Sequence, residues 1–453
     1  MNRLINLYLT ICVCMVVASC SKEATIKIVA ENTEDLSLYM FERGDVNLLR
    51  TIDINSETSS GNITVQLPYE GLYLIGKKEY ASFPIYLKSG DCVDLEYKNN
   101  RLLLSEDIED ENRLLFDWEE AVGNLKVYSF LHNYLPGAHS VPYDEFFNEL
   151  EDIITFKEVY LEKLSKKKGK FYTYLRNKIQ VDVDFYALYY LKNSASQIPD
   201  TVELPAIYKQ LQNKEYTLNS DLLNIPYAGN ILEAYAWFGC ENKGDMRSEM
   251  EYLKEKDLQQ EYLLTRASRF KFYDEYQSML DWVGLNFFTG NYSNRLKKIK
   301  DRLAWSAPGL QAPDFKAMSL DSTWVNLSDY KGKTVVVDVW ATWCEPCKRM
   351  LPLFHQLEQD LKNEDVTFIN VCIGTWVEMD LWREMAKEFQ IENNTFFVNG
   401  WKSEFVTDYH ITGVPRYMVF DKNGCIVSVK APNPSTPKLK EFIMRTLKKD
   451  SSM

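Results

Sequence analysis

The sequence predicts a multidomain protein in which an N-terminal β-sandwich, a central all-α region and a C-terminal α/β domain follow one another. Three observations predict this order. Residues 21–105 alternate polar and apolar side chains, residues 106–304 carry apolar side chains at helical spacing, and residues 306–453 alternate short apolar runs with helical segments. A chain of 453 residues is long enough for roughly two to four domains.

The composition narrows the classes of partner that the chain can have. The formal net charge is −13 at pH 7, which argues against binding to nucleic acid. Apolar residues make up 45% of the chain, which is enough for sizeable cores. The 28 tyrosines and the other aromatic residues argue against extensive disorder.

Residues 1–19 have the pattern of a lipoprotein signal peptide. Arg3 precedes a mostly apolar run, residues 4–17, that is short for a membrane span and ends in small residues. The sequence VASC at residues 17–20 resembles a lipobox, so we expect lipid on Cys20 and attachment to a membrane. An ordinary signal peptide or an uncleaved anchor is the alternative. The expected location is the cell envelope, facing the periplasm, where thiols tend to be oxidised.

Residues 21–105 predict the β-sandwich. Polar and apolar side chains alternate over residues 24–30, 36–40 and 62–67, and turn-forming residues such as those at 59–62 separate these segments. About seven short strands at this spacing are typical of a small sandwich.

Residues 106–304 predict a helical domain. The segments 143–168, 171–193 and 249–268 carry apolar residues at helical steps between charged ones. The aromatic run FYALYYL at residues 185–191 indicates a helical core rather than a binding face. Proline and glycine punctuate residues 305–313, so we expect a domain boundary there and independent folding of residues 306–453.

The organising feature of residues 306–453 is a pair of cysteines between a strand and a helix. The β-branched run at residues 335–337 predicts a buried strand, and it leads into the sequence WCEPC at residues 343–347. Apolar residues then recur at three- and four-residue steps, and Pro346 suits a first helical turn. Cys344 thus lies at a helix N-terminus, which favours a thiolate, and Cys347 lies one turn further and can close a disulfide.

A structural zinc half-site and an inert disulfide are the alternatives for this cysteine pair. Zinc would require a second pair of ligands at short spacing, and none follows in the sequence. We therefore expect no metal. The remaining cysteines downstream of Cys20 are far apart in sequence, and we expect them to be small apolar residues without a structural disulfide. They are Cys92, Cys240, Cys372 and Cys425.

Residues 306–453 resemble thioredoxin, and within that superfamily the ResA/TlpA type of envelope thiol-disulfide oxidoreductase. The resemblance rests on WATWCEPC at residues 340–347, on Asp338, on Pro352 and on the sequence GVP at residues 413–415. It implies a thioredoxin fold with a cis peptide bond before Pro415. It also implies a surface that binds substrate, formed by Trp343, Glu345, Pro346, Val414 and Pro415.

The expected chemistry is disulfide exchange. Cys344, being outermost, would attack, and Cys347 would resolve the mixed disulfide. Asp338 lies in an apolar strand, where desolvation raises a carboxyl pKa, so it could accept the proton of Cys347. The negative charge of Glu345 beside Cys344 favours a reductase with a potential nearer about −270 mV than about −120 mV.

The expected partners are disulfide-bearing envelope proteins, a membrane thiol reductant and the membrane itself, with no cofactor besides the redox-active cysteine pair. Two departures from the ResA type affect substrate selection. Met350 stands where that type has a glutamate, and Arg416 stands where threonine is common. We expect Arg416 either to select acidic partners or to be solvated.

Two other functions stay open. A thiol peroxidase of the same superfamily has a threonine three residues before its attacking cysteine, whereas this chain has Ala341 there and Thr342 one step later. A binding lipoprotein is the other alternative, in which the N-terminal domains hold a partner and the thioredoxin-like domain only docks.

Overall fold

The computed structural model describes residues 23–451, apart from residues 31–35, 56, 77–81, 99–100, 105–109, 131–138, 195–197, 214–217 and 241–242. The expected signal peptide and the expected lipid site at Cys20 lie outside the described residues. The chain divides into two compact units, Met1–Leu263 (unit 1) and Leu264–Met453 (unit 2). Among the described helices, none is long and apolar enough to cross a membrane.

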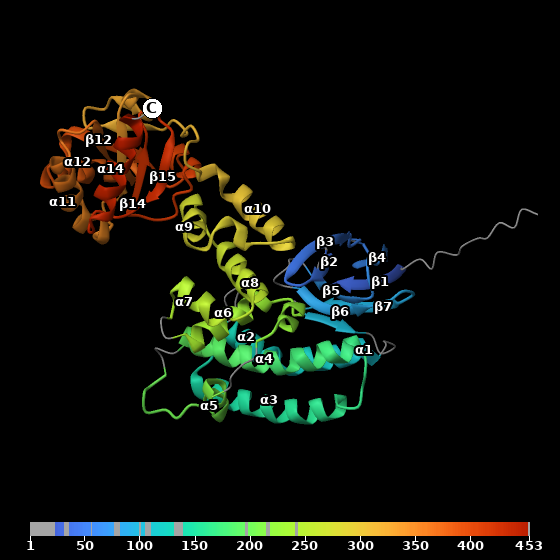
Figure 1. Cartoon of the computed structure of the whole chain (residues 1–453). Coiled ribbons are helices and arrows are strands. Elements are labelled where there is room, and N and C mark those ends of the chain that lie inside the picture. The colour runs from blue at the N-terminus through green and yellow to red at the C-terminus, as the bar shows by residue number, and fades with distance from the viewer. Residues whose placement is uncertain are drawn as a thin grey trace, which may run out of the picture. The chain divides into compact units, whose positions relative to one another are not determined.

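Unit 1 begins with two four-stranded sheets (Figure 1). Their strands are β1 (Glu23–Ala30), β2 (Leu36–Glu42), β3 (Asp45–Ile52), β4 (Ser60–Gln66), β5 (Gly71–Gly76), β6 (Ser82–Leu87), β7 (Cys92–Lys98) and β8 (Arg101–Leu104). One sheet has the order β4-β1-β7-β8 and the other the order β3-β2-β5-β6. Alternate side chains of both sheets, such as Ile26 and Leu38, form one buried apolar cluster. The strands expected at 24–30, 36–40 and 62–67 correspond to β1, β2 and β4.

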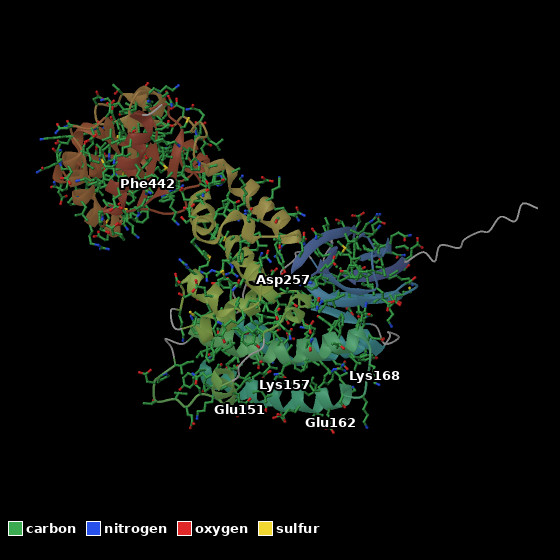
Figure 2. All side chains as sticks on the ribbon, viewed as in Figure 1. Glu151, Lys157, Glu162, Lys168, Asp257 and Phe442 are labelled. Carbon is green, nitrogen blue, oxygen red and sulfur yellow. A yellow bond between two sulfur atoms is a disulfide. The ribbon has the colours of Figure 1, made fainter. Side chains whose placement is uncertain are left out.

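Helices follow the sheets in unit 1. They are α1 (Asp110–Ala121), α2 (Gly123–Ser129), α3 (Tyr143–Leu164), α4 (Lys170–Ser194), α5 (Ala206–Asn213), η4 (Ser220–Asn224), α6 (Ala228–Gly239), α7 (Met246–Tyr252) and α8 (Lys256–Ala267), the last of which runs past the end of unit 1 at Leu263. Glu151 and Glu162 lie on the exposed side of α3 (Figure 2). The single helix expected at 249–268 is instead α7 and α8, because Leu253 has an extended backbone that ends α7.

The interior of the helical region contains an aromatic segment and a buried ion cluster. Phe185, Tyr186 and Tyr190 of α4 are buried, so the prediction of a helical core is confirmed. Lys178 is fully buried, and its Nζ lies 2.7 Å from both Glu119 Oε1 and Asp182 Oδ2. Removing one partner of such a cluster would leave an uncompensated buried charge, so the cluster fixes how α1 and α4 pack.

Unit 2 is built around a mixed seven-stranded sheet with the order β10-β9-β13-β12-β11-β14-β15. Its strands are β9 (Lys316–Ser319), β10 (Trp324–Asn326), β11 (Thr334–Trp340), β12 (Val366–Gly374), β13 (Thr395–Asn399), β14 (Arg416–Phe420) and β15 (Ile426–Ala431). The central strand β11 pairs parallel with β12 and antiparallel with β14. All seven residues of β11 are buried, as the apolar run predicts.

Helices cover both faces of this sheet, as the sequence predicts. They are α9 (Tyr273–Val283), η5 (Leu285–Phe287), α10 (Asn291–Leu303), η6 (Ala304–Ser306), η7 (Leu327–Tyr330), α11 (Glu345–Asp360), η8 (Trp376–Glu378), α12 (Met379–Glu388), η9 (Glu392–Asn394), α13 (Glu404–Asp408) and α14 (Lys438–Ser451). Val336 of β11 packs with α11 and α14 on one face. Val335, Val337 and Val339 pack with α13 on the other.

Residues 264–305 belong to unit 2, although the sequence places them in the helical domain and the boundary near residue 306. Phe272 is 6% exposed and is part of the buried cluster on the α13 face of the sheet. Just after it, Asp274 Oδ2 accepts a hydrogen bond of 2.8 Å from Ser428 Oγ of β15. The rings of Trp305 and His410 stack with centroids 4.0 Å apart. These contacts join positions more than a hundred residues apart, which local proline and glycine signals do not report.

We therefore expect the free energy of unfolding to be higher for a fragment of residues 264–453 than for a fragment of residues 306–453. The difference should be about 3 kcal/mol or more, because the shorter fragment lacks Phe272 and exposes the apolar surface that it covers. Urea unfolding of both fragments measures this difference. In the longer fragment, Phe272→Ala should reproduce most of the loss, whereas Leu285→Ala, at a position 64% exposed, should change little. Equal unfolding free energies would show that residues 306–453 fold alone.

Candidate redox site

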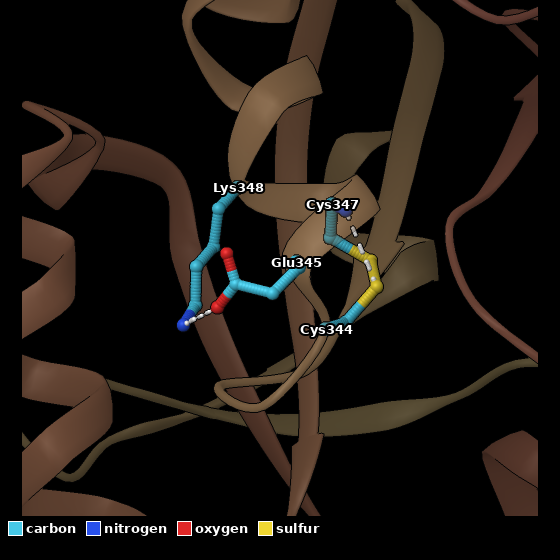
Figure 3. Close-up of a disulfide and its surroundings, with 4 residues drawn as sticks. All are labelled: Cys344, Glu345, Cys347 and Lys348. Carbon is cyan, nitrogen blue, oxygen red and sulfur yellow. Dashed lines mark hydrogen bonds and ion pairs between the residues drawn. A yellow bond between two sulfur atoms is a disulfide. The ribbon is translucent and has the colours of Figure 1, made fainter.

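Cys344 lies between β11 and α11, and Cys347 lies in the first turn of α11, where the sequence predicts them (Figure 3). Cys344 is the residue before the first turn of α11, and Cys347 is joined to it by a disulfide. The backbone N–H of Cys347 donates to Cys344 Sγ over 3.2 Å. Pro346 occupies the first turn, where its missing N–H leaves no partner unsatisfied. The sulfur of Cys344 thus faces a helix N-terminus, which stabilises a thiolate in the reduced form.

Both cysteines are buried in the disulfide form. Cys344 is 2% exposed and Cys347 is fully buried, so Cys344 is the outer of the two, as expected, but only by a small margin. It packs in an apolar cluster with large neighbours that include Trp340 and Trp382. The neighbouring side chains of the motif lie at the surface, with Trp343 58% exposed. A partner must therefore contact the surrounding surface closely to reach the Cys344 sulfur.

Asp338 lies in the middle of β11, on the same face of the sheet as Trp340. It is fully buried, and neither of its carboxylate oxygens has a hydrogen-bond partner among the described residues. Burial raises the pKa of Asp338 to about 8. Its register neighbours are Asn370 on β12 and Tyr417 on β14. A carboxyl group with a pKa near neutrality can take up and release a proton under working conditions.

The peptide bond between Val414 and Pro415 is cis, as the resemblance implies. Val414 is partly buried and packs against the cluster that contains both cysteines. Within the part of the chain that the structure describes, the N–H and C=O of Val414 form no backbone hydrogen bond.

Arg416 is neither solvated nor available to an acidic partner, so both expectations for it are wrong. It is 7% exposed, and it donates from Nε to the carbonyl of Val429 over 2.8 Å and from Nη1 to the carbonyl of His410 over 3.0 Å. Its guanidinium lies 4.6 Å from the ring centre of Phe272. Burial lowers the pKa of Arg416 to about 10. Arg416 therefore links the segment after the cis bond to Phe272, the residue before α9.

Glu345 is paired with Lys348, although the sequence alone suggests that its charge is unopposed. Its Oε1 accepts a hydrogen bond of 2.7 Å from Lys348 Nζ, as Figure 3 shows. The Glu345 side chain is 69% exposed and the Lys348 side chain 29% exposed. The hydrogen bond from Lys348 lowers the pKa of Glu345. The two charges partly cancel at Cys344, so the effect of Glu345 on the thiol is smaller than its charge alone suggests.

We expect Glu345→Gln to shift the redox potential of the cysteine pair upward, because it removes the anion and frees the Lys348 ammonium to stabilise the thiolate. Lys348→Gln should shift the potential downward, and the double variant should return close to the original value. Each single shift should be small, on the order of 10 to 20 mV, since solvent screens an exposed ion pair. Titration of the full chain in glutathione buffers gives these potentials. Single shifts of one common sign would contradict the pairing.

The loops that follow β12 and β13 also contribute residues near the motif, and the sequence does not predict this. Thr342 Oγ1 donates to Glu378 Oε1 over 3.0 Å, which ties the loop before Cys344 to η8. The rings of Trp343 and Trp401 lie 6.2 Å apart. The signal that the sequence offers is the apolar pair Trp376-Val377, which comes shortly after the end of β12. In the structure both side chains are exposed and are not part of the core.

Comparison with known proteins agrees with this geometry. A Redoxin family model matches residues 307–443. The thiol-disulfide oxidoreductase ResA of Bacillus cereus (strain ATCC 10987 / NRS 248) is 24% identical over 164 residues, which make up 36% of this chain and 87% of ResA. The thioredoxin-like protein YneN of Bacillus subtilis (strain 168) is 30% identical over 122 residues, which make up 27% of this chain and 69% of YneN.

Among solved structures, the thioredoxin domain of a thiol-disulfide oxidoreductase from Bacteroides vulgatus is 25% identical. The alignment covers 31% of this chain and 98% of that domain, with a TM-score of 0.28. The family assignment rests on the sequence relatives and on the matched family model. The chain therefore belongs to the ResA/TlpA-like thiol-disulfide oxidoreductases of the thioredoxin superfamily.

Proposed function

We propose that this chain is a membrane-tethered reductase of protein disulfides in the cell envelope, working through Cys344 and Cys347. The observation that carries the proposal is the disulfide at the N-terminus of α11, with the cis peptide bond before Pro415 in the adjoining loop. The tether and the envelope location are proposed from the lipobox-like sequence at residues 17–20.

The proposed reaction begins with the reduced cysteine pair. The Cys344 thiolate attacks one sulfur of a substrate disulfide, whose S–S bond breaks and leaves an electron pair on the other sulfur, which takes up a proton. Cys347 then loses its proton and attacks Cys344 Sγ, which releases the second substrate thiol. Two electrons and two protons pass to the substrate, and a membrane thiol reductant regenerates the pair by the same exchange.

Asp338 is the proposed acceptor of the Cys347 proton. Support comes from its complete burial, its raised pKa and its position on the central strand that leads to the motif. A base with a pKa near 8 can take a proton from a thiol and return it without a large energetic penalty in either direction.

The proposed substrate surface consists of the exposed residues Trp343, Glu345 and Pro346 together with the backbone of Val414 and Pro415. The free N–H and C=O of Val414 could pair with an extended substrate strand, as in other cases of strand addition. Such pairing would bring the substrate disulfide to the nearly buried Cys344 sulfur.

Insulin reduction tests the proposal against the peroxidase alternative. With dithiothreitol as reductant, the full chain should accelerate insulin-disulfide reduction well above dithiothreitol alone and should consume hydrogen peroxide no faster than free thiol. The physical reason is that Thr342 is 3% exposed and its hydroxyl already donates to Glu378, so it is not directed toward a peroxide at Cys344. Faster turnover of peroxide than of insulin would instead identify a peroxidase.

A further inference from the structure

Five exposed apolar side chains of unit 2 lie on the segments that follow β11, β12 and β13, and we call them the tryptophan rim. Their exposed fractions range from 38% for Trp401 to 92% for Val377. Large apolar side chains that gather at one surface usually mark a binding site, whereas isolated ones need no explanation. The rim consists of Trp343, Trp376, Val377, Leu381 and Trp401.

The fold brings the rim together because its loops follow three neighbouring parallel strands. β11, β12 and β13 are parallel, so their carboxyl ends lie at one edge of the sheet. The Gly400 N–H donates to the Gly374 carbonyl over 2.7 Å, which joins the loops after β12 and β13. Trp376 packs on Phe397 with ring centroids 5.7 Å apart. Phe397 belongs to the buried cluster that contains Cys344 and Cys347.

Hydrogen bonds between Thr375 and Glu378 cap η8, which carries Trp376 and Val377 of the rim. The N–H and hydroxyl of Thr375 both donate to Glu378 Oε2, over 2.7 and 2.8 Å. The other oxygen of Glu378 accepts from Thr342. Glu378 thus fixes η8 against the loop before Cys344, and Trp376 and Val377 at the start of η8 stay exposed. This preformed surface reduces the ordering cost of binding a partner.

We propose that the tryptophan rim binds apolar and aromatic side chains next to the cysteine of an extended substrate polypeptide, and so selects substrates for the reductase. The inference rests on the proposed function. Disulfide exchange brings a polypeptide to Cys344, which is 2% exposed, so the substrate residues flanking its cysteine must lie against the rim. Apolar flanking residues bury the apolar surface of the rim and make the free energy of binding more favourable, whereas polar flanking residues leave this surface exposed to water.

The charges around the rim favour a polypeptide over a lipid surface. The side chain of Asp380 in the same segment is 92% exposed and that of Glu345 is 69% exposed. Each carboxylate is paired with a cation, Asp380 with Arg383 over 3.3 Å and Glu345 with Lys348 over 2.7 Å. Binding to an anionic membrane draws on clustered basic residues whose charge is unopposed, and these ion pairs do not supply it. An apolar peptide segment needs no such charge.

The test compares three disulfides as substrates of the full chain. Two are peptides with one disulfide and equal charge, one with phenylalanine and leucine beside its cysteines and the other with serine and asparagine. The third is hydroxyethyl disulfide, which is too small to cover the rim. We expect the apolar peptide to react about tenfold faster than the polar one. Trp376→Ser, Val377→Ser and Trp401→Ser should each reduce this preference and leave the hydroxyethyl disulfide rate unchanged.

Leu285→Ser is the matched control, because Leu285 is 64% exposed in the same unit but lies outside the rim. Equal rates for both peptides, together with normal reduction of hydroxyethyl disulfide, would overturn the rim inference and leave the proposed function standing. Failure to reduce any of the three would overturn the proposed function itself. Vesicles of phosphatidylglycerol and phosphatidylethanolamine form the last arm, with Cys20→Ser to remove lipidation. If the protein sediments with these vesicles, and if Trp401→Ser abolishes this sedimentation without changing the rates of peptide reduction, the rim would be a lipid-binding surface.

Discussion

Replacing Cys344 with serine is expected to lower the rate of insulin-disulfide reduction by about 10³-fold or more, because the covalent nucleophile is lost. Serine preserves the size and the burial of the side chain but forms no thiolate at neutral pH. The backbone N–H of Cys347, which donates to Cys344 Sγ, then has no sulfur anion to stabilise. Insulin turnover with dithiothreitol as reductant measures the loss.

Replacing Cys347 with alanine is expected to separate the two halves of the reaction. Cys344 can still attack a substrate disulfide, but the mixed disulfide has no second thiol to resolve it. The variant should therefore accumulate on substrate proteins as adducts that run at higher mass on non-reducing gels and disappear on reduction. Mass spectrometry of these adducts identifies the physiological substrates.

Cys372→Ala is the matched control for both cysteine variants. Cys372 is fully buried in the same apolar cluster as the disulfide, yet it is free, and burial raises the pKa of its thiol well above the usual range. Its replacement should leave insulin turnover within about twofold of the original rate, since an inert buried thiol takes no part in exchange. Loss of turnover in this control, with Cys344→Ser still active, would reverse the assignment of the nucleophile.

The parts of unit 2 that the sequence predicts correctly are those with local signals. The run of β-branched residues in β11 and the apolar spacing of α11 each report their own structure, since both elements are decided by neighbours in sequence. The cis bond before Pro415 was predicted from the family resemblance, because no local pattern requires it.

The parts that the sequence did not predict depend on distant contacts. The guanidinium of Arg416 lies over the ring of Phe272, far away in sequence, and donates hydrogen bonds to the carbonyl groups of Val429 and His410. β13 was missed because its short buried run of five residues has no alternation. The burial of Cys344 likewise depends on a distant residue, because Trp382 of α12 belongs to the apolar cluster in which Cys344 packs.

Replacing Asp338 with asparagine is expected to stabilise the disulfide form of the protein at neutral and alkaline pH. Burial raises the pKa of Asp338 from 3.8 to about 8, so its ionised form is strongly disfavoured in the folded state. At about 1.4 kcal/mol per pKa unit, this shift corresponds to several kcal/mol of unfolding free energy. Asparagine has nearly the same volume and never ionises, so the variant avoids this penalty.

The pH dependence has a defined sign. Below about pH 4 the carboxyl is protonated in both folded and unfolded chains and contributes no difference. Between pH 3.8 and about 8 the unfolded carboxyl ionises while the folded one stays protonated, so the stability of the original protein falls as pH rises. Above about pH 8 both forms are ionised and this contribution is constant. The advantage of Asp338→Asn should therefore grow from pH 4 to pH 8 and then level off.

The same variant is expected to slow disulfide exchange while it gains stability. Asparagine cannot accept the Cys347 proton, and loss of a positioned base typically costs about 10²-fold or more in rate. Asp274→Asn is the matched control, because burial also raises the pKa of Asp274, but its carboxylate is bonded to Ser428 of β15. Urea unfolding without reductant and insulin turnover, each measured from pH 4 to 9, provide both readouts. An Asp338→Asn variant that keeps the full pH slope of stability, or exchanges disulfides as fast as the original protein, would show that this carboxyl does not handle the proton.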